Sequence, residues 1–417
     1  MWIHWRKSCS RRSKRTKGHP PSKRTFFPLN DNTSANFTQT YFFLFVGVVV
    51  LRNILLKLAK NRTTELSLSL FFIVFCLSPK FFFTLYFPHK MSCVVETLRS
   101  VSGRVIILGD LHGCLENAKN LLRELHFSNE QVRTVPGLLY SPGEAVSNGQ
   151  EDMCVFVGDL INKGPDSYGC IRFLRDIGAR GVLGNHDIKM LRLREKIAHD
   201  EKLKKKEKES TLLPLAVDCP PDLMEFLSSV PHVLDIPQHD VVVVHAGLDP
   251  TLSLEDQEVE AVTRMRNLVK KKKYFKAAKV DEEIPEPLST SETYVAVERN
   301  KIGKPWAKTY SKLVSRLGES PSTSSEGNSR PSESPTASEE EGEDVEEEEG
   351  NSAVCLEFYR GKTVVFGHDA KRRLQVTPFA IGLDSGCVYG GQLTGITFPG
   401  RQLTSVPGWS ADHISNV

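Results

Sequence analysis

The stretch Val105-Ile106-Ile107-Leu108-Gly109-Asp110-Leu111-His112-Gly113-Cys114 decides the fold of this chain. Its first four residues suit a buried strand, so Asp110 and His112 are expected just beyond the carboxyl end of that strand. Open α/β sheets bind their ligands at this end. A carboxylate oxygen and an imidazole nitrogen suit a divalent transition metal. One Asp-x-His triplet is more often a satisfied polar turn, so the metal interpretation depends on repetition.

The same construction returns at four further places in the sequence. The apolar runs 154–157, 181–183, 241–244 and 363–366 each lead into a glycine, asparagine, aspartate or histidine. A parallel or mixed sheet would gather these strand ends along one rim. The candidate metal ligands are therefore the polar residues at the five ends, namely Asp110, His112, Asp159, Asn185, His245 and His368.

Composition is that of an ordinary soluble protein with unequal segments. The chain has 417 residues, 40% of them hydrophobic, and its formal charge of +3 hides a basic amino terminus and an acidic run late in the chain. Its 9 cysteines are scattered, with no Cys-x-x-Cys, which favours free thiols in a reducing compartment over a disulfide framework. We therefore expect a cytoplasmic location.

Residues 1–90 differ from the rest of the chain and form a basic and hydrophobic extension. Two apolar stretches between residues 41 and 87 are interrupted, one by Arg52 and the other by Pro79-Lys80. A membrane helix needs about 20 uninterrupted apolar residues. Three interpretations stay open: a membrane anchor acting through 41–87, an organelle-targeting segment, or translated sequence upstream of a true start. We expect the catalytic domain to occupy residues 91–417, beginning at Met91.

Alternating strand and helix patterns between residues 101 and 200 predict an α/β sheet with right-handed crossovers. Helices are expected at 115–126 and 167–177, with a Gly- and Pro-rich loop at 134–152 between them. A further helix is expected to begin after residue 187 and to run into the lysines at 202–208. That lysine run and the one at 270–273 are expected to be solvated, and no DNA-binding motif is present.

Two segments late in the chain have distinct compositions. Residues 318–350 contain Ser, Pro, Gly and acid, which predicts a disordered acidic insertion because too little apolar surface is available for burial. Residues 380–399 alternate apolar residues with glycines, which predicts an antiparallel pair of strands at the edge of the second half of the core. Asp166 and Asp187 are expected to cap helices, and Asp384 to satisfy a turn.

If the five strand ends converge, they provide a site for two cations. Asp110 and His112 would hold one ion, Asp159 would bridge, and the second ion would be held by Asn185, His245 and His368. Two ions roughly 3.5–4 Å apart acidify a bridging water and neutralise charge on attacking and leaving oxygens, so the expected substrate is a phosphate attacked in line by bridging hydroxide.

Further residues are expected to serve the substrate. His186, beside Asn185, is the candidate general acid for the leaving oxygen. The remaining phosphate oxygens need cations, and the candidates are Lys163, Arg264 and Arg266.

These motifs together resemble the calcineurin-like metallophosphoesterases and phosphoprotein phosphatases. The resemblance spans about residues 103 to 400 and includes Gly-Asp-x-His-Gly, Gly-Asp-x-x-x-x-Gly, Gly-Asn-His-Asp, His-Ala-Gly and Gly-His. The ApaH-like branch, whose bacterial members are symmetrical bis(5'-nucleosyl)-tetraphosphatases, is the most similar. The motifs that indicate it are 158–167, Thr263-Arg264-Met265-Arg266, Lys304-Pro305-Trp306 and Leu383-Asp384-Ser385-Gly386-Cys387.

The resemblance implies a four-layer α/β-β-α sandwich with mixed sheets and two metal ions between them, manganese, cobalt, or iron with zinc. By position, it implies the ligand set above and the acid role of His186. It predicts hydrolysis of phosphoanhydride bonds in dinucleoside polyphosphates or nucleotide-capped RNA, with protein serine/threonine phosphatase as the alternative. Those phosphatases carry Asp-Arg-Gly where this chain has Asn162-Lys163-Gly164, so the carboxylate that pairs with their catalytic histidine is missing.

Overall fold

The structure is a computed structural model that describes residues 93–141, 149, 151–280, 284, 286–299, 301–318 and 351–410. The extension at 1–90, including the 41–87 stretches, lies outside the described residues, and so does the acidic segment 319–350. The predictions made for these segments therefore stay predictions. Within the described ranges, no helix is long and apolar enough to cross a membrane.

The apolar run Val105–Leu108 forms the central strand of a five-stranded mixed sheet. Its strand order is β15-β14-β2-β3-β4, with bounds Gln402–Pro407, Gln392–Phe398, Val105–Leu108, Met153–Phe156 and Arg180–Gly181. Strands β2, β3 and β4 run parallel, while β14 pairs antiparallel with both β2 and β15. The crossovers carry the predicted helices, α4 (Leu115–Glu124) and α6 (Ser167–Asp176), and the short α5 (Glu130–Thr134) lies in the first crossover.

A six-stranded mixed sheet contains the two remaining strands that end in candidate ligands, those at 241–244 and 363–366. Its order is β1-β5-β6-β11-β13-β12, with bounds Val95–Thr97, Val233–Ile236, Val241–Val244, Thr363–Phe366, Ala380–Gly382 and Gln375–Val376. Strands β6, β11 and β13 are parallel, and the strand ends of β6 and β11 face the site. The expectation of one shared rim was therefore wrong, because the five strands are divided between two sheets.

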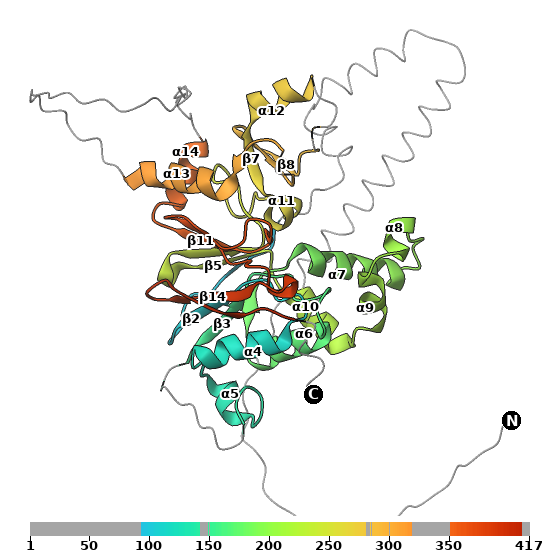
Figure 1. Cartoon of the computed structure of the whole chain (residues 1–417). Helices are drawn as coiled ribbons and strands as arrows, with labels where there is room; N and C mark the ends of the chain where they lie inside the picture. The colour runs from blue at the N-terminus through green and yellow to red at the C-terminus, as the bar shows by residue number, and fades with distance from the viewer. Residues whose placement is uncertain are drawn as a thin grey trace, which may run out of the picture. The chain divides into compact units, whose positions relative to one another are not determined.

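The two sheets pack face to face because both faces of their strands are apolar. In β2, Val105 and Ile107 point into an apolar cluster shared with Val241 and Val243 of β6. The intervening residues, such as Ile106, join a second cluster formed with the helices. Figure 1 shows the resulting layers, with α13 and α14 on one side of the strands and α4 and α6 on the other. The predicted four-layer α/β-β-α sandwich is confirmed.

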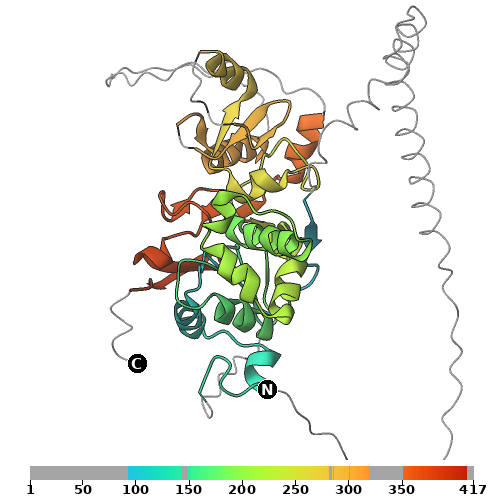
Figure 2. The ribbon, with the colours of Figure 1, turned by 90° about the vertical axis from the view of Figure 1, so that its right-hand side faces the viewer.

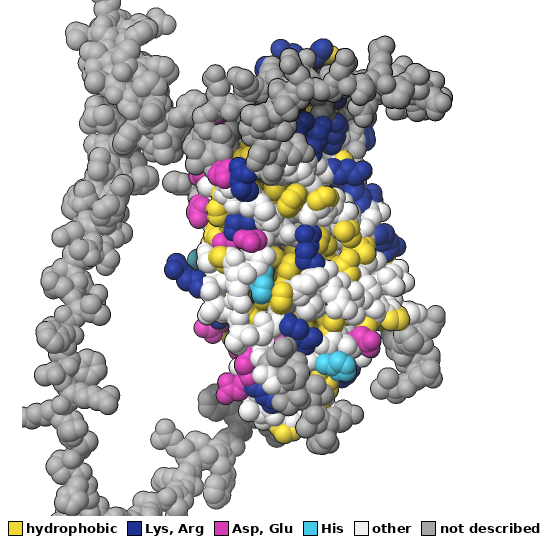
Figure 3. Space-filling view, turned by 90° about the vertical axis from the view of Figure 1, so that its left-hand side faces the viewer, with side chains coloured by type: hydrophobic (Ala, Val, Ile, Leu, Met, Phe, Trp, Pro, Cys, Tyr) yellow, Lys and Arg dark blue, Asp and Glu magenta, His cyan; other side chains and the backbone are white. Residues whose placement is uncertain are grey.

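The remaining elements extend this core. A four-stranded antiparallel sheet has the order β10-β7-β9-β8, with bounds Lys304–Pro305, Asn267–Lys270, Tyr294–Val297 and Ser289–Thr290. Helices α11 (Val259–Arg264) and α12 (Lys271–Ala278) flank β7, α13 spans Trp306–Gly318, and α14 spans Asn351–Phe358. The face in Figure 3 carries a concentration of Lys and Arg side chains in its upper part, on the side where Figure 1 places α12.

Helices α7 to α10 form a separate layer beside the strand ends. They span Asn185–Ala198, Lys205–Lys208, Leu212–Asp218 and Pro221–Ser229, and Figure 2 shows these green helices in front of the strand layers. The predicted helix through 202–208 is interrupted, because α7 ends at Ala198. The lysines of α8 are largely exposed, as expected of a solvated run.

The predicted hairpin at 380–399 was wrong. Strand β13 pairs parallel with β11 in the six-stranded sheet, whereas β14 pairs antiparallel with β2 and β15 in the five-stranded sheet. The connection between them contains Asp384, whose carboxylate accepts a hydrogen bond from the Gly386 backbone N–H at 3.1 Å, so the predicted turn role of Asp384 is confirmed. This segment crosses from one sheet to the other, and its Asp384 carboxylate interacts electrostatically with His112 and Asp159.

Candidate metal centre

The carboxyl ends of the five strands converge between the two sheets. Strand β2 leads to Asp110 and His112, β3 to Asp159, β4 to Asn185 in the first turn of α7, β6 to His245, and β11 to His368. Most of these polar side chains are buried: Asp159 is 2% exposed and His245 fully enclosed. Buried groups of this kind need partners, because an isolated buried charge is costly.

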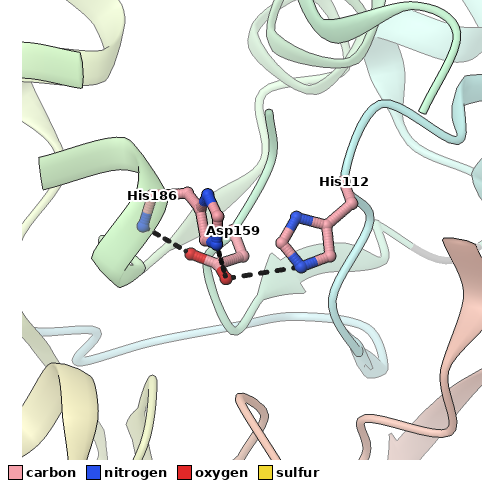
Figure 4. A group of neighbouring side chains, drawn as sticks. All are labelled: His112, Asp159 and His186. Carbon is pink, nitrogen blue, oxygen red and sulfur yellow. Dashed lines mark hydrogen bonds and ion pairs between the residues drawn. The ribbon is translucent and has the colours of Figure 1, made fainter. Parts of the chain in front are cut away.

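Asp159 lies in the middle of the cluster. Its Oδ2 atom is 3.5 Å from His112 Nε2 and 4.0 Å from His186 Nε2, and Figure 4 shows these three side chains. Its Oδ1 atom is 3.6 Å from His245 Nε2. The backbone helps to place it: Asp159 has a φ of 51°, and a Cβ on Gly184 would overlap its backbone nitrogen and carboxylate. Each oxygen of Asp159 therefore faces a different imidazole.

Two histidines present lone pairs to this centre. The Nδ1 atoms of His112 and His245 lie 3.1 and 2.8 Å from the carbonyl oxygens of Ile161 and Val157. A carbonyl only accepts, so each Nδ1 carries the proton and donates it. Nε2 of each ring is consequently left with its lone pair: His112 Nε2 accepts from Lys163 Nζ at 2.8 Å, and the two Nε2 atoms lie 3.5 and 3.6 Å from the oxygens of Asp159. Such backbone anchoring is how proteins fix the tautomer and orientation of metal-binding histidines.

Asn185 joins the second group. Its Oδ1 atom lies 3.1 Å from His245 Nε2 and 3.0 Å from His368 Nδ1. Because His245 Nε2 and Asn185 Oδ1 are both acceptors, a cation between them would turn repulsion into attraction. The side chain of Asp110 accepts the backbone N–H of His368 with both oxygens at 3.1 Å.

Two sets of candidate ligands result, and they share one residue. His112, Asp159 and His186 form one set of ligand atoms, and Asp110, Asp159 and His245 form the other, each within 4.8 Å. Asp110 thus lies with His245, although the sequence pairs it with His112; the division of ligands between two ions stays a prediction. The oxygen and imidazole donors fit a divalent transition metal.

The charges in the cluster influence one another strongly. Burial, helped by Asp384 and Asp159, raises the pKa of Asp110 well above its usual range. Burial would also raise the pKa of Asp159, but the imidazoles of His245, His112 and His186 outweigh it and hold that pKa below its usual range. Burial lowers the pKa of His112. Asp159 is therefore favoured as a carboxylate and His112 as a neutral imidazole, the forms that bind metals, whereas burial and the neighbouring carboxylates favour the protonated form of Asp110.

The two acids next to the motifs have structural partners. Asp166 accepts the Gly169 N–H at 2.7 Å and caps α6, as predicted. Asp187 accepts the N–H groups of Gly184 at 2.9 Å and Leu160 at 3.1 Å, which confirms its capping role. Burial and the nearby Asp159 charge raise the pKa of Asp187 to about 8.

The three predicted phosphate-binding cations differ in position. Lys163 is closest, with its Nζ atom 2.8 Å from His112 Nε2 and 5.2 Å from the ring centre of Tyr389. Arg266 lies behind the centre, with its Nε atom 3.4 Å from Asp369 Oδ1. Arg264 is engaged elsewhere, donating to Glu260 and Glu298 at 2.9 and 2.8 Å.

The structure also supplies a partner for His186 that sequence reasoning left open. The Asn162 Nδ2 atom lies 3.0 Å from His186 Nδ1. The signal was present, because Asn162 stands where related phosphatases carry the missing carboxylate. Asp369, adjacent to His368, was also overlooked, and it lies 2.6 Å from Arg372 Nη1. The pKa of His186 is lowered to about 4, mainly by burial and against the opposing effect of Asp159.

Comparison with known proteins agrees with this geometry. The model of the calcineurin-like phosphoesterase family matches residues 103–372. Symmetrical bis(5'-nucleosyl)-tetraphosphatases of Shewanella sp. (strain MR-7) and Thioalkalivibrio sulfidiphilus are 32% and 34% identical over 152 and 169 residues, covering 36% and 38% of this chain. These matches cover 46% and 53% of the relatives, so the chain spans about half the length of the curated relatives it matches. A solved structure described as a candidate diadenosine tetraphosphatase is 36% identical, with a TM-score of 0.50, and the match covers 76% of this chain and 100% of that one.

Proposed function

The chain belongs to the calcineurin-like phosphoesterase family, in its ApaH-like branch, and is a hydrolase of phosphate esters or anhydrides; from this premise we propose that it cleaves phosphoanhydride bonds of dinucleoside polyphosphates. The bond cleaved lies between two phosphates, and the products are nucleotides. Nucleotide-capped RNA contains the same kind of bond and is included in the proposal. Manganese, cobalt, or iron with zinc are the metal ions proposed.

The single observation that carries the proposal is the position of Asp159 between the two ligand sets. Its two oxygens face different imidazoles at 3.5 and 3.6 Å, which is the arrangement expected of a carboxylate that bridges two cations. We assign Asp110 and His112 to one ion, and Asn185, His245 and His368 to the other. Both oxygens of Asp110 accept the backbone N–H of His368, so this carboxylate also lies against the ligands of the second ion.

Two bound divalent ions would acidify water and neutralise charge on the phosphate. Side chains of the protein would bind the phosphate oxygens and assist the leaving oxygen. Lys163, which reaches the centre from the loop after β3, would hold a phosphate oxygen, and Arg266 would contribute positive charge from behind His368. Arg264 is the weakest of the three candidates because its guanidinium already pairs with two carboxylates. His186 faces the centre and is assigned to the leaving oxygen.

The nucleotide substrate is supported by what the relatives are named to cleave and by departures from the protein phosphatases. Asn162-Lys163-Gly164 replaces their Asp-Arg-Gly, and an ammonium is a point charge that lacks the planar fork of a guanidinium. We also propose a cytoplasmic location, supported by the seven cysteines of the described residues, all of which are free thiols.

The test is a substrate panel on metal-analysed protein. Diadenosine tetraphosphate, nucleotide-capped RNA and a phosphoserine peptide would be offered to the full chain with manganese, and kcat/KM would be compared. We expect the dinucleotide or the capped RNA to be preferred. Preference for the phosphopeptide would replace the proposal with protein phosphatase activity, and no turnover of any phosphate compound would reject it.

A further inference from the structure

An exposed aromatic ring lies beside the metal centre. In the part of the chain that the structure describes, the exposed aromatic residues are Phe275 on α12, Phe358 on α14 and Tyr389, which is 57% exposed. Tyr389 contacts a candidate site residue, because Lys163 Nζ lies 5.2 Å from the centre of its ring. The same Nζ atom lies 2.8 Å from His112 Nε2. One ammonium group therefore lies between this ring and the metal centre.

The backbone that carries this ring is well anchored. Tyr389 ends the single 3₁₀ turn η2 (Cys387–Tyr389), in the segment that crosses between the two sheets. The other two residues of the turn, Cys387 and Val388, are buried. The Cys387 carbonyl accepts the backbone N–H of Trp409 at 2.9 Å, and the Tyr389 N–H donates to the Gly386 carbonyl at 3.0 Å. The ring is therefore exposed to solvent on a backbone that is held in place.

The cations of the centre do not distinguish a nucleotide from other phosphate compounds. Metal ions and Lys163 would bind phosphate oxygens, which inorganic polyphosphates and phosphopeptides also have. The nucleobase is what sets a nucleotide apart, and every base has a π-face that stacks on an aromatic ring. Because one ribose joins the base to the first phosphate, a base at Tyr389 and a phosphate at Lys163 can belong to the same nucleotide.

We propose that Tyr389 is the platform on which a nucleobase of the substrate stacks while Lys163 holds a phosphate of the same nucleotide. This inference deepens the proposed function and rests on it for the phosphate site. Stacking uses the face of the base and not its hydrogen-bonding edge, so adenine and guanine should both be accepted. Tyr389 is thus a specificity-determining residue that takes no part in breaking the bond.

Binding of ADP and of inorganic diphosphate provides the direct test. Both ligands contain two linked phosphates, and ADP alone carries a base. Each would be titrated into the manganese-loaded full chain in a calorimeter. Base stacking on an aromatic side chain contributes roughly 5- to 150-fold to affinity. Tyr389→Ala should therefore weaken ADP binding by a factor in that range and leave diphosphate binding nearly unchanged. Equal losses for both ligands, or no loss for ADP, would overturn the inference.

Two further variants separate stacking from other effects. Tyr389→Phe retains the ring and should bind ADP as the wild type does. If it loses as much affinity as Tyr389→Ala, the hydroxyl makes the contact and the stacking platform is rejected. Phe275→Ala is the matched control, because it removes an exposed aromatic ring from α12 and should leave both affinities unchanged. An equal loss of ADP affinity in this control would contradict a specific platform at Tyr389.

Turnover of diadenosine tetraphosphate gives an independent measurement. Stacking is the same in the bound substrate and in the transition state, so Tyr389→Ala should raise KM and change kcat little. A fall in kcat with KM unchanged would overturn the platform role and make Tyr389 part of the chemical step. Wild-type protein that fails to cleave diadenosine tetraphosphate would reject the proposed function. Cleavage together with ADP binding that does not respond to Tyr389→Ala would reject this inference alone.

Discussion

Replacing Asp159 with Asn should remove most of the stabilisation that metal binding gives the folded state. In the wild type, each candidate ligand set contains an oxygen of Asp159, facing His112 on one side and His245 on the other. The amide retains the shape but replaces one oxygen with a nitrogen that does not bind metal, and it removes the negative charge. Both sets are therefore damaged by one substitution.

The magnitude follows from linkage. Manganese at 100 times its dissociation constant stabilises the folded state by about 2.7 kcal/mol. For a domain of this size, whose unfolding entropy is about 0.6–0.7 kcal/mol/K, that corresponds to a rise in Tm of about 4–5 °C. Losing even an outer contact to a metal ligand costs about 10- to 100-fold in affinity. A 100-fold loss leaves the variant at roughly its dissociation constant, where the stabilisation is about 0.4 kcal/mol and the rise about 1 °C.

The assay is thermal unfolding with and without manganese, together with metal analysis of the dialysed protein. Asp166→Asn is the matched control, because Asp166 caps α6 through Gly169 and Asn is an equally good cap. The control should keep the full manganese-induced shift and turn over substrate normally. An Asp159→Asn protein that kept the wild-type shift, two ions and wild-type turnover would refute the bridging assignment.

Three further predictions follow from separate features. Lys163→Arg should tighten inhibition by inorganic phosphate by about 2- to 10-fold, since a guanidinium adds a hydrogen bond worth roughly 0.5–1.5 kcal/mol; unchanged or weaker inhibition would remove Lys163 from the substrate contacts. Asp152→Asn should lower the free energy of unfolding at pH 7 by about 1–3 kcal/mol. Although burial opposes it, Arg104 holds the pKa of Asp152 below its usual range, so the ion pair stabilises the fold above the pKa of the unfolded state and stops doing so as pH falls through the pKa of the folded state. Urea unfolding of both proteins at pH 7 and pH 3 should therefore show that the difference in free energy of unfolding shrinks at the lower pH. A constant difference would contradict the ionic explanation. Protein comprising residues 91–417 should keep the kcat/KM of the full chain, and an inactive or insoluble product would move the domain boundary.

The sequence predicted the local parts of this molecule well because they depend on short patterns. The run 105–108 is apolar on both faces and is followed by glycine, so a buried strand that ends at Leu108, just before Asp110, was the expected result. All six candidate ligands lie at such ends, and the structure brings them together. What the pattern could not state is which sheet each strand joins, because pairing is set by partners hundreds of residues away.

The errors have the same origin. Alternating apolar residues and glycines at 380–399 indicated two strands correctly, but their pairing with β11 and β2 is decided by packing between distant segments. The partner of His186 was left open for a different reason: Asn162 lies 24 residues away from it, and only its place in the motif, where related phosphatases carry a carboxylate, pointed to the contact. The helix expected through 202–208 stopped at Ala198 because lysine favours helix locally but contributes no buried face to hold one in place.

The five-stranded sheet has a consequence for how the protein is made. Its middle strand, β2, is flanked by β3 from the early part of the chain and by β14, the next to last strand, and Gly109 donates its N–H to Thr394. On the ribosome, the strand that carries Asp110 and His112 must wait with one edge unpaired until nearly 300 further residues have been synthesised. An open edge invites pairing with other nascent chains. The edge of β2 that pairs with β14 is therefore the part of this sheet open longest to mispairing during translation, before the catalytic centre exists.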